Sequence, residues 1–149
     1  MSDASATEVA ARLVAEFEGF VPAPYLCPAG VWTIGYGTTR IDGRPVDAQT
    51  LPVDHGRALA LLRNDLLQAA RDVDRLCRMP LTTNQRAALI SFVHNLGSPA
   101  LQQSSLLRQM KNGRMDAAAG EFNRWIKGGG RTLPGLVRRR AAERALFEA

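Results

Sequence analysis

The 149-residue chain contains only two cysteines and two histidines. Two cysteines allow one disulfide bond at most, which excludes a disulfide-rich scaffold. Cys27 and Cys77 are far apart, no Cys-x-x-Cys pair is present, and the histidines stand alone at positions 55 and 94. Because structural zinc sites need several closely spaced ligands of these types, the sequence predicts no zinc site and two free thiols.

Long apolar runs are missing as well. No run approaches the roughly 20 residues that a membrane-spanning helix needs. Residues 1–15 include Asp3, Glu8 and Arg12, so they lack the apolar core of a signal peptide. We therefore expect synthesis in the cytoplasm and no stable membrane insertion. Hydrophobic residues make up 46% of the chain and charged residues 22%, which is typical of one globular domain with a real core.

Acidic residues are scarce in the last part of the chain. Residues 1–109 contain ten basic and ten acidic residues, whereas residues 110–149 contain nine basic and four acidic, which accounts for the net charge of +5. This asymmetry indicates a polyanionic partner, either a bacterial envelope or a nucleic acid, or else a solvated helix face with spare arginines. The arginines at 138–140 lack interleaved aromatic residues and a known motif, so we expect no nucleic-acid partner.

The first third of the chain changes from a helical to a strand-like pattern. Residues 5–8 (Ser-Ala-Thr-Glu) match the capping box and predict a helix that ends near Glu18. The apolar face expected for this helix consists of residues at a spacing of four: Val9, Leu13 and Phe17. Residues 25–50 are rich in β-formers and glycines, which predicts a small antiparallel sheet with tight turns.

Beyond Pro52 the pattern stays helical. Asp54 is expected to cap a long helix that ends before Pro80, and Thr82 or Thr83 to cap a second one that stops at Gly97. Shorter helices are predicted at residues 104–112, 116–125 and 134–147, with a flexible joint at the glycines 128–130. This order predicts an α+β chain that is mainly α.

Residues 16–39 carry the candidate chemistry. Glu18 stands at a helix end beside two phenylalanines, where partial burial would favour the protonated form that a general acid needs. Thr33 on a strand offers a hydroxyl that can hold a water, and Cys27 lies between them on a turn-rich loop. Taken alone, the same residues fit an alternative in which Glu18 is solvated, Cys27 is packed and Thr33 simply forms a strand.

The spacing of these residues resembles the active-site motif of the phage lysozymes of glycoside hydrolase family 24. That motif is Glu, eight residues, Asp or Cys, five residues, Thr, and here it reads Glu18, Cys27 and Thr33. The similarity continues through the Thr-Ile-Gly-Tyr-Gly run at 33–37 and through much of the C-terminal half, up to the Arg-Arg-Arg-Ala-Ala-Glu segment at 138–143. It covers nearly the whole chain from residue 16 onward.

The resemblance implies a two-lobed lysozyme-like fold, with a small antiparallel sheet and a helical C-terminal lobe. Residues 1–149 would form a single domain, with the sheet lobe at about 19–52, a linking helix at about 54–78 and the helical lobe at about 80–149. The cleft would lie between the lobes, with no metal and no organic cofactor. The implied activity is hydrolysis of the β-1,4 bond between N-acetylmuramic acid and N-acetylglucosamine in bacterial peptidoglycan.

The resemblance also implies roles for individual residues. Glu18 would be the acid, with Cys27 and Thr33 completing the catalytic set. An ordinary cysteine is only a few per cent thiolate at pH 7. Cys27 therefore either has a lowered pKa, or orients a water as a neutral thiol together with Thr33; a covalent thioglycosyl intermediate ranks third. Substrate contacts are expected from a further set of residues: Tyr25, Tyr36, Gln102 and Ser104.

Two departures from the family pattern stand out. Many relatives carry Asp where this chain has Cys27, and many carry His where it has Thr38, which removes a polar neighbour of the acid. The remaining aromatic and histidine candidates have packing alternatives: Tyr25 and Tyr36 fit a sugar contact and the core of the sheet equally, and His94 fits an interhelix position better than a catalytic one.

The biology implied is that of a monomeric phage or prophage endolysin. It would be made in the host cytoplasm and reach the cell wall in the periplasm through a holin-type pore. Two alternatives remain open: a virion-associated lysozyme, and a catalytically silent peptidoglycan-binding module held by the basic C-terminal third.

Overall fold

The computed structural model describes the backbone of residues 3–149 and the side chains of residues 6–149. Eight helices, one of them a short 3₁₀ helix, lie in this part of the chain: α1 Asp3–Glu18, α2 His55–Leu76, α3 Thr83–Leu96, α4 Ser98–Gln102, α5 Ser105–Lys111, α6 Met115–Glu121, η1 Phe122–Arg124 and α7 Pro134–Glu148. The strands form three antiparallel pairs: β1 Val21–Leu26 with β2 Trp32–Gly35, β3 Arg40–Ile41 with β4 Arg44–Pro45, and β5 Lys127–Gly128 with β6 Arg131–Thr132. The predicted α+β class, mainly α, is confirmed.

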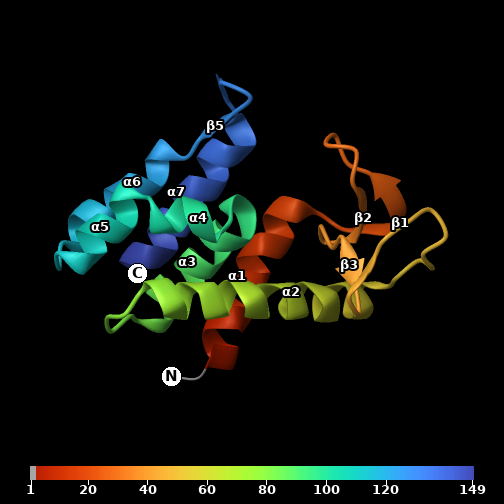
Figure 1. Cartoon of the computed structure of the whole chain (residues 1–149), viewed down its shortest axis with the longest axis horizontal. Helices are drawn as coiled ribbons and strands as arrows, with labels where there is room; N and C mark the ends of the chain where they lie inside the picture. The colour runs from red at the N-terminus through yellow and green to blue at the C-terminus, as the bar shows by residue number, and fades with distance from the viewer. Residues whose placement is uncertain (1–2) are drawn as a thin grey trace.

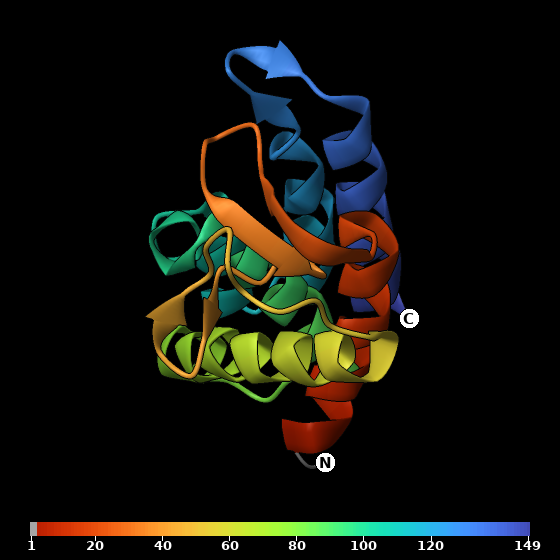
Figure 2. The same ribbon diagram turned by 90° about the vertical axis from the view of Figure 1, so that its right-hand side faces the viewer.

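The molecule has two lobes (Figure 1). Strands β1 to β4 form the lobe on the right, and α3 to α7 form the helical lobe on the left. Helix α2 runs along the base from one lobe to the other, and α1 rises between them and leads into β1. Turned by 90°, the molecule presents the β1–β2 hairpin in front of the end of α1 (Figure 2).

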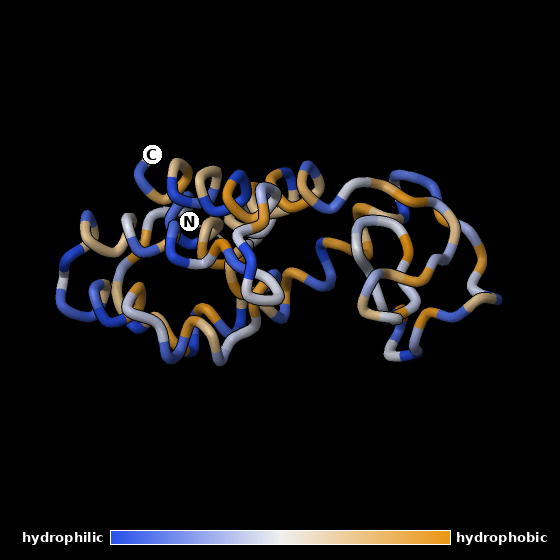
Figure 3. Tube along the Cα trace, turned by 90° about the horizontal axis from the view of Figure 1, so that it is seen from above, coloured by the Kyte–Doolittle hydropathy of each residue, from blue (hydrophilic) through white to orange (hydrophobic). Residues whose placement is uncertain are grey.

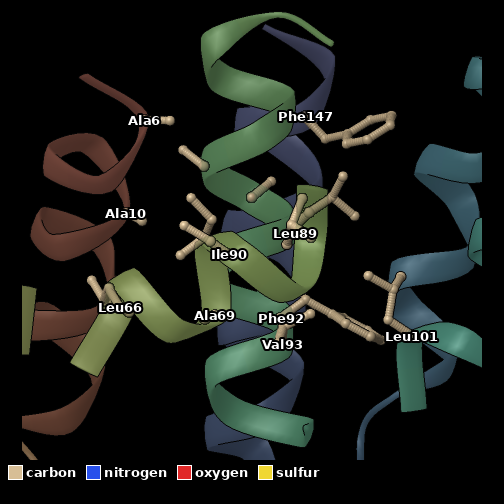
Figure 4. Close-up of a cluster of buried hydrophobic side chains, with 14 of the residues drawn as sticks. Ala6, Ala10, Leu66, Ala69, Leu89, Ile90, Phe92, Val93, Leu101 and Phe147 are labelled. Atoms are coloured by element: carbon tan, nitrogen blue, oxygen red, sulfur yellow. The ribbon is translucent and has the colours of Figure 1, made fainter. Parts of the chain in front are cut away.

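Helix α3 is the centre of the hydrophobic core (Figure 4). Its consecutive residues 87–93 are all buried, so the helix is surrounded by other elements rather than laid on a surface. Side chains from four other helices pack around it: Ala6, Ala10, Leu66, Ala69, Leu101 and Phe147. The start of α3 is the predicted one, because Thr82 and Gln85 form a reciprocal capping box.

Helix α1 differs from the prediction in its start and in its buried face. It begins at Asp3, so the residue expected as its cap, Ser5, lies inside the helix; the Ser5 side chain is outside the described part. The Glu8 carboxylate, expected in the capping box, instead accepts two hydrogen bonds from Arg63 on α2. The fully buried positions are Ala6, Ala10 and Val14, which allow close approach of α2 and α3. The predicted face of Val9, Leu13 and Phe17 is only half-buried.

The glycine triplet at 128–130 is not a flexible joint. Gly129 and Gly130 have φ values of 59° and 79° and form the two-residue turn of the β5–β6 hairpin. Positive φ at both central positions is the geometry that glycine adopts without strain. Gly128 lies against Leu133, since a Cβ there would be 2.6 Å from Leu133 Cδ1. The hairpin is therefore packed onto the start of α7.

Hydrophilic and hydrophobic residues alternate along the helices (Figure 3). Accordingly, no helix among residues 3–149 is both long enough and apolar enough to cross a membrane.

Candidate active site

Glu18 is the last residue of α1, at the junction of the two lobes. Gly19 follows with a φ of 71°, which turns the chain out of the helix and into β1. The Glu18 carboxylate faces the sheet lobe on one side: a Cβ built on Gly37 would lie 3.0 Å from Oε2. On the other side, Arg139 Nη1 donates a hydrogen bond to Oε1 over 3.1 Å. The Glu18 side chain stays 29% exposed, so it is held from two directions and open to solvent from a third.

Cys27 and Thr33 lie together on the β1–β2 hairpin. The Cys27 and Val31 main chains are joined by a hydrogen bond of 3.0 Å, which closes the turn between the strands. Thr33 is buried and its hydroxyl donates to the Val31 carbonyl over 2.9 Å, within reach of the Cys27 thiol. The predicted trio therefore comes from two elements, with the acid on a helix end and its two partners on the hairpin in front of it (Figure 2).

The turn stabilises the thiolate form of Cys27. The main-chain N–H of Val31 is the largest cause that lowers the pKa of the thiol, and the Ala29 N–H and the Thr33 hydroxyl add to it, while desolvation acts in the opposite direction. Because a hydroxyl carries one proton, Thr33 must turn away from the Val31 carbonyl to donate to a thiolate. The thiol is half-exposed, so this change does not require the hairpin to open.

A pocket of about 640 Å³ lies beside Glu18 on the side of the helical lobe. Its walls include Asn95 from α3 and Leu133, Gly135 and Arg138 from the start of α7. Arg138 is exposed and Leu133 is partly so. Glu18 thus has Gly37 of the sheet lobe on one side and a mixed polar and apolar pocket on the other.

Two of the four residues expected to contact the substrate, Tyr36 and Ser104, have structural roles. Tyr36 is buried, and its hydroxyl shares a hydrogen bond of 3.1 Å with His55 Nδ1, while Phe20 stacks on the same histidine. This arrangement corresponds to the packing alternative for Tyr36. Ser104 is also buried: its hydroxyl accepts a hydrogen bond from Leu107 N and donates to the Leu101 carbonyl, so it caps α5. Both hydroxyls have protein partners, and their contact with a sugar stays a prediction.

The other two expected contacts remain accessible. Tyr25 is half-buried and pairs with Thr33 in the β1–β2 register, which places it on the hairpin that carries Cys27. Gln102 is exposed at the end of α4 and lines a pocket of about 230 Å³ together with Ser104 and Arg108. Their role in binding stays a prediction.

Two arginines that the sequence grouped with the surface charge are in fact buried. Arg139 contacts Glu18, and Arg140 is fully buried with Glu143, so neither is available for a polyanion. Both interpretations offered for the basic C-terminal part, a surface that binds a polyanion and a solvated helix face, are therefore wrong for Arg139 and Arg140. The available signal was the spacing of these arginines from Glu143 by three and four residues, which places all three on one side of a helix.

His94 on α3 is half-buried near this ion pair. Burial and the Arg139 charge lower its pKa, and the Glu18 carboxylate partly offsets this effect. Within residues 3–149, no group of three or more His, Cys, Asp and Glu side chains is arranged to hold a metal ion.

Thr38, at the position where the resemblance to phage lysozymes implies that His is common, connects the sheet lobe to α2. Its buried hydroxyl donates to Asp65 Oδ2 over 3.0 Å. Burial raises the pKa of the Asp65 carboxyl, and the Thr38 hydroxyl offsets part of that rise. Gly35 packs directly on Ala58, and Val53 N donates to the Pro22 carbonyl over 2.9 Å. Three separate contacts therefore join the sheet lobe to α2 and to the residues just before it.

We expect Asp65→Asn to be at least as stable as the wild type at pH 7. A raised pKa means that the folded state keeps a proton that the unfolded state has released, so this carboxyl contributes most stability below about pH 4 and loses it as the pH rises through its folded-state pKa. The amide avoids ionisation and keeps an oxygen for the Thr38 hydroxyl. Urea unfolding at pH 4 and pH 7 measures the difference in unfolding free energy between Asp65→Asn and the wild type. A gain in stability of the variant should appear only at pH 7.

The matched variant Thr38→Val removes the donor instead. It leaves the partly buried Asp65 carboxylate without its hydrogen bond and should cost about 1–2 kcal/mol of stability at pH 7. An Asp65→Asn protein that is less stable than the wild type at pH 7, yet equal to it at pH 4, would contradict this account of the contact.

Comparison with known proteins agrees with the geometry. The phage lysozyme family model matches residues 15–143. The chain is 39% identical over 142 residues to an endolysin of Acyrthosiphon pisum secondary endosymbiont phage 1, covering 92% of this chain and 93% of the relative. Among solved structures, the endolysin from Escherichia coli O157:H7 phage FAHEc1 superimposes with a TM-score of 0.86 at 30% identity, over 93% of this chain and 90% of the other. The muramidase domain of SpmX from Asticaccaulis excentricus gives 0.82 at 37% identity, over 99% and 97%.

The fold and the site define a two-lobed, lysozyme-like hydrolase. The chain belongs to the phage lysozyme family.

Proposed function

We propose that this chain is a peptidoglycan-cleaving endolysin, a muramidase that hydrolyses the β-1,4 bond between N-acetylmuramic acid and N-acetylglucosamine. Family membership supports the class of activity, and relatives named endolysin or muramidase support the substrate. The observation that carries the residue roles is the position of Glu18, with the Cys27–Thr33 hairpin on one side and an open pocket on the other.

Glu18 is the general acid in this proposal. As the bond between C1 of N-acetylmuramic acid and the glycosidic oxygen breaks, Glu18 donates its proton to that oxygen. A water held by Thr33 and Cys27 attacks C1, and the Cys27 thiolate accepts a proton from it. The main-chain donors in the hairpin turn support this base role because they lower the pKa of the thiol.

Loss of turbidity of purified bacterial walls tests the activity. A muramidase clears the suspension catalytically, at enzyme concentrations far below that of the wall repeats. A silent peptidoglycan-binding module would sediment with the walls and leave their turbidity unchanged, and that outcome would replace the enzyme with the binding module.

We also propose the biological setting of an endolysin acting as a monomer, with peptidoglycan and no nucleic acid as its partner. It would be made in the host cytoplasm and act on the wall after release through a holin-type pore. The virion-associated alternative predicts that the protein is found in purified phage particles, whereas an endolysin is found in the lysate and not in the particle.

Exposed basic residues near the Glu18 pocket should guide the enzyme onto the anionic wall. Lys127 and Arg131 lie on the β5–β6 hairpin and Arg138 lines the pocket, and all three are exposed. We expect the triple replacement by Gln to weaken wall binding severalfold at low salt and to flatten its salt dependence, because screening acts on exposed charges over about 10 Å at 0.1 M salt. Sedimentation with walls across a salt series measures both effects.

A second triple variant provides the charge-matched control. Arg71, Arg75 and Arg78 are exposed on and just after α2, and their replacement by Gln removes the same net charge elsewhere. Equal losses of wall affinity in the two triple variants would show that only net charge matters and would refute docking near the pocket.

A further inference from the structure

A cluster of charged residues is buried behind Glu18, between α3 and α7. Arg139, Arg140 and Glu143 project from one side of α7 and are each at most 3% exposed. Glu143 Oε2 accepts hydrogen bonds from Arg140 Nη2 over 3.2 Å and from Arg139 Nε over 3.5 Å, and Oε1 forms an ion pair with Arg140 Nε at 2.8 Å. Glu143 is therefore the shared partner of the two guanidinium groups.

Helix α3 supplies the remaining partners of the cluster. The Ser91 hydroxyl donates to Glu143 Oε2 over 2.6 Å, and the Ser91 carbonyl accepts from Arg139 Nη2 over 3.2 Å. Asn95 Oδ1 accepts from Arg140 Nη2 over 2.7 Å, and the Arg140 guanidinium lies over the Phe92 ring. These contacts hold Arg139 in one orientation, with Nη1 directed at Glu18.

The charges of the cluster balance only when Glu18 is included. Two buried arginines carry two positive charges and Glu143 carries one negative charge, so one positive charge is left. Buried ions need a counter-charge because desolvation is costly. Glu18, which Arg139 contacts directly, supplies the second negative charge when it is ionised.

We propose that Glu143 is a positioning residue for the reaction: it anchors Arg139 against Glu18 and supplies the negative charge that keeps Glu18 from being the sole counter-ion of two arginines. The proposal rests on the proposed function, because it takes Glu18 as the acid. With Glu143 in place, protonating Glu18 leaves one unbalanced positive charge in the cluster. Without Glu143 it would leave two, and the protonated form needed by a general acid would be disfavoured.

Other charged and polar groups also face Glu18, and they are unchanged in the test. Glu16 on α1 and Arg138 on α7 line the same pocket, Asn95 and His94 lie on α3, and the sheet lobe presents the Gly37 backbone. Burial raises the pKa of Glu143, whereas Arg140, the Ser91 hydroxyl and Arg139 act to lower it. Its contacts of 2.8 Å with Arg140 Nε and 2.6 Å with the Ser91 hydroxyl are those of a carboxylate.

The direct test is a pH titration of the Glu18 side-chain carboxyl by ¹³C NMR in the folded proteins. We expect Glu143→Gln to move the midpoint of this titration down by about 0.5 pH unit or more, and Arg139→Gln to move it up by about 1 pH unit. Opposite signs are the critical feature, because general destabilisation cannot shift one carboxyl in two directions.

Two further variants separate charge from structure. Glu148 lies on the same helix and forms an exposed ion pair with Arg144. Glu148→Gln removes the same charge as Glu143→Gln and should leave the Glu18 midpoint unchanged. Glu143→Asp keeps the charge and should keep the midpoint within about 0.2 pH unit of the wild type. On a soluble glycan, Glu143→Gln should lower kcat by about tenfold with little change in KM, since misplacing a reacting group affects the chemical step, and Glu143→Asp should recover part of kcat.

The outcomes distinguish this inference from the proposed function. If Glu143→Gln does not fold, the Arg139→Gln and Glu143→Asp titrations decide. Three results would each overturn the positioning role. The first is an unchanged Glu18 midpoint in Arg139→Gln. The others are a Glu18 midpoint that falls in Glu143→Asp as far as expected for Glu143→Gln, and a shift in Glu148→Gln equal to that in Glu143→Gln. Full activity of a folded Glu18→Gln variant would instead overturn the assignment of the acid.

Discussion

Glu18→Gln is expected to lose at least about a hundredfold of the rate of wall lysis. The amide keeps the shape of the side chain and an oxygen for the Arg139 hydrogen bond, so the fold should persist. It cannot transfer a proton to the glycosidic oxygen. The initial rate of turbidity loss measures the effect, and circular dichroism together with sedimentation on walls verifies that folding and binding remain.

Glu16→Gln is the matched control for this prediction. Glu16 is an exposed carboxylate two residues away on α1, and it lines the same pocket. It should retain most of the activity, because it has no contact with the Arg139 guanidinium among the described side chains. If Glu18→Gln keeps its activity and Glu16→Gln loses it, the acid has been assigned to the wrong carboxylate.

Cys27→Ala is expected to lose about tenfold to a hundredfold of activity, and Cys27→Asp to retain substantial activity. Alanine can neither accept a proton nor orient a water, whereas aspartate restores a carboxylate base at the position where many lysozymes of this type have one. Both variants should fold, because the Cys27 side chain is half-exposed and its main chain closes the turn. An alanine variant as active as the wild type would leave Thr33 as the sole holder of the water.

Alkylation of the native protein tests the state of the Cys27 thiol independently. Cys27 should react with iodoacetamide, with a midpoint below the usual thiol pKa of about 8.5, since hairpin donors lower its pKa. Cys77 is an internal control: it is buried, and burial raises its pKa to about 11, so it should react only after unfolding. Inactivation should follow the modification of Cys27.

Features that depend on a few neighbouring residues were predictable from the sequence. The Asp54 cap of α2, a threonine cap of α3 at Thr82 or Thr83 and the end of α3 at Gly97 were expected, and the structure confirms them with Thr82 as the cap. The two caps rely on a side chain that reaches a backbone N–H three residues ahead. The end at Gly97 relies on a glycine with a φ of 90°, so in each case the local pattern is sufficient. The Glu18, Cys27 and Thr33 spacing was likewise readable, because all three lie within 16 consecutive positions.

Features that depend on contacts between distant segments were not predictable. The ion pair of Arg139 with Glu18 joins residues 121 positions apart, so no local pattern could place these two side chains together. Tyr36 and Ser104 carry hydroxyls suited to sugars, yet His55 and the α5 backbone use them. The buried face of α1 was mistaken because close helix packing favours its alanines over its larger side chains.

Mass analysis of purified peptidoglycan after digestion tests the central claim most directly. Hydrolysis of the β-1,4 bond adds one water to each cleaved bond and leaves N-acetylmuramic acid with a free reducing end that borohydride converts to the alcohol. We predict these reducible products from the wild type and their absence with Glu18→Gln. Products lighter by one water and resistant to borohydride, the 1,6-anhydro sugars of a lytic transglycosylase, would contradict the hydrolytic mechanism.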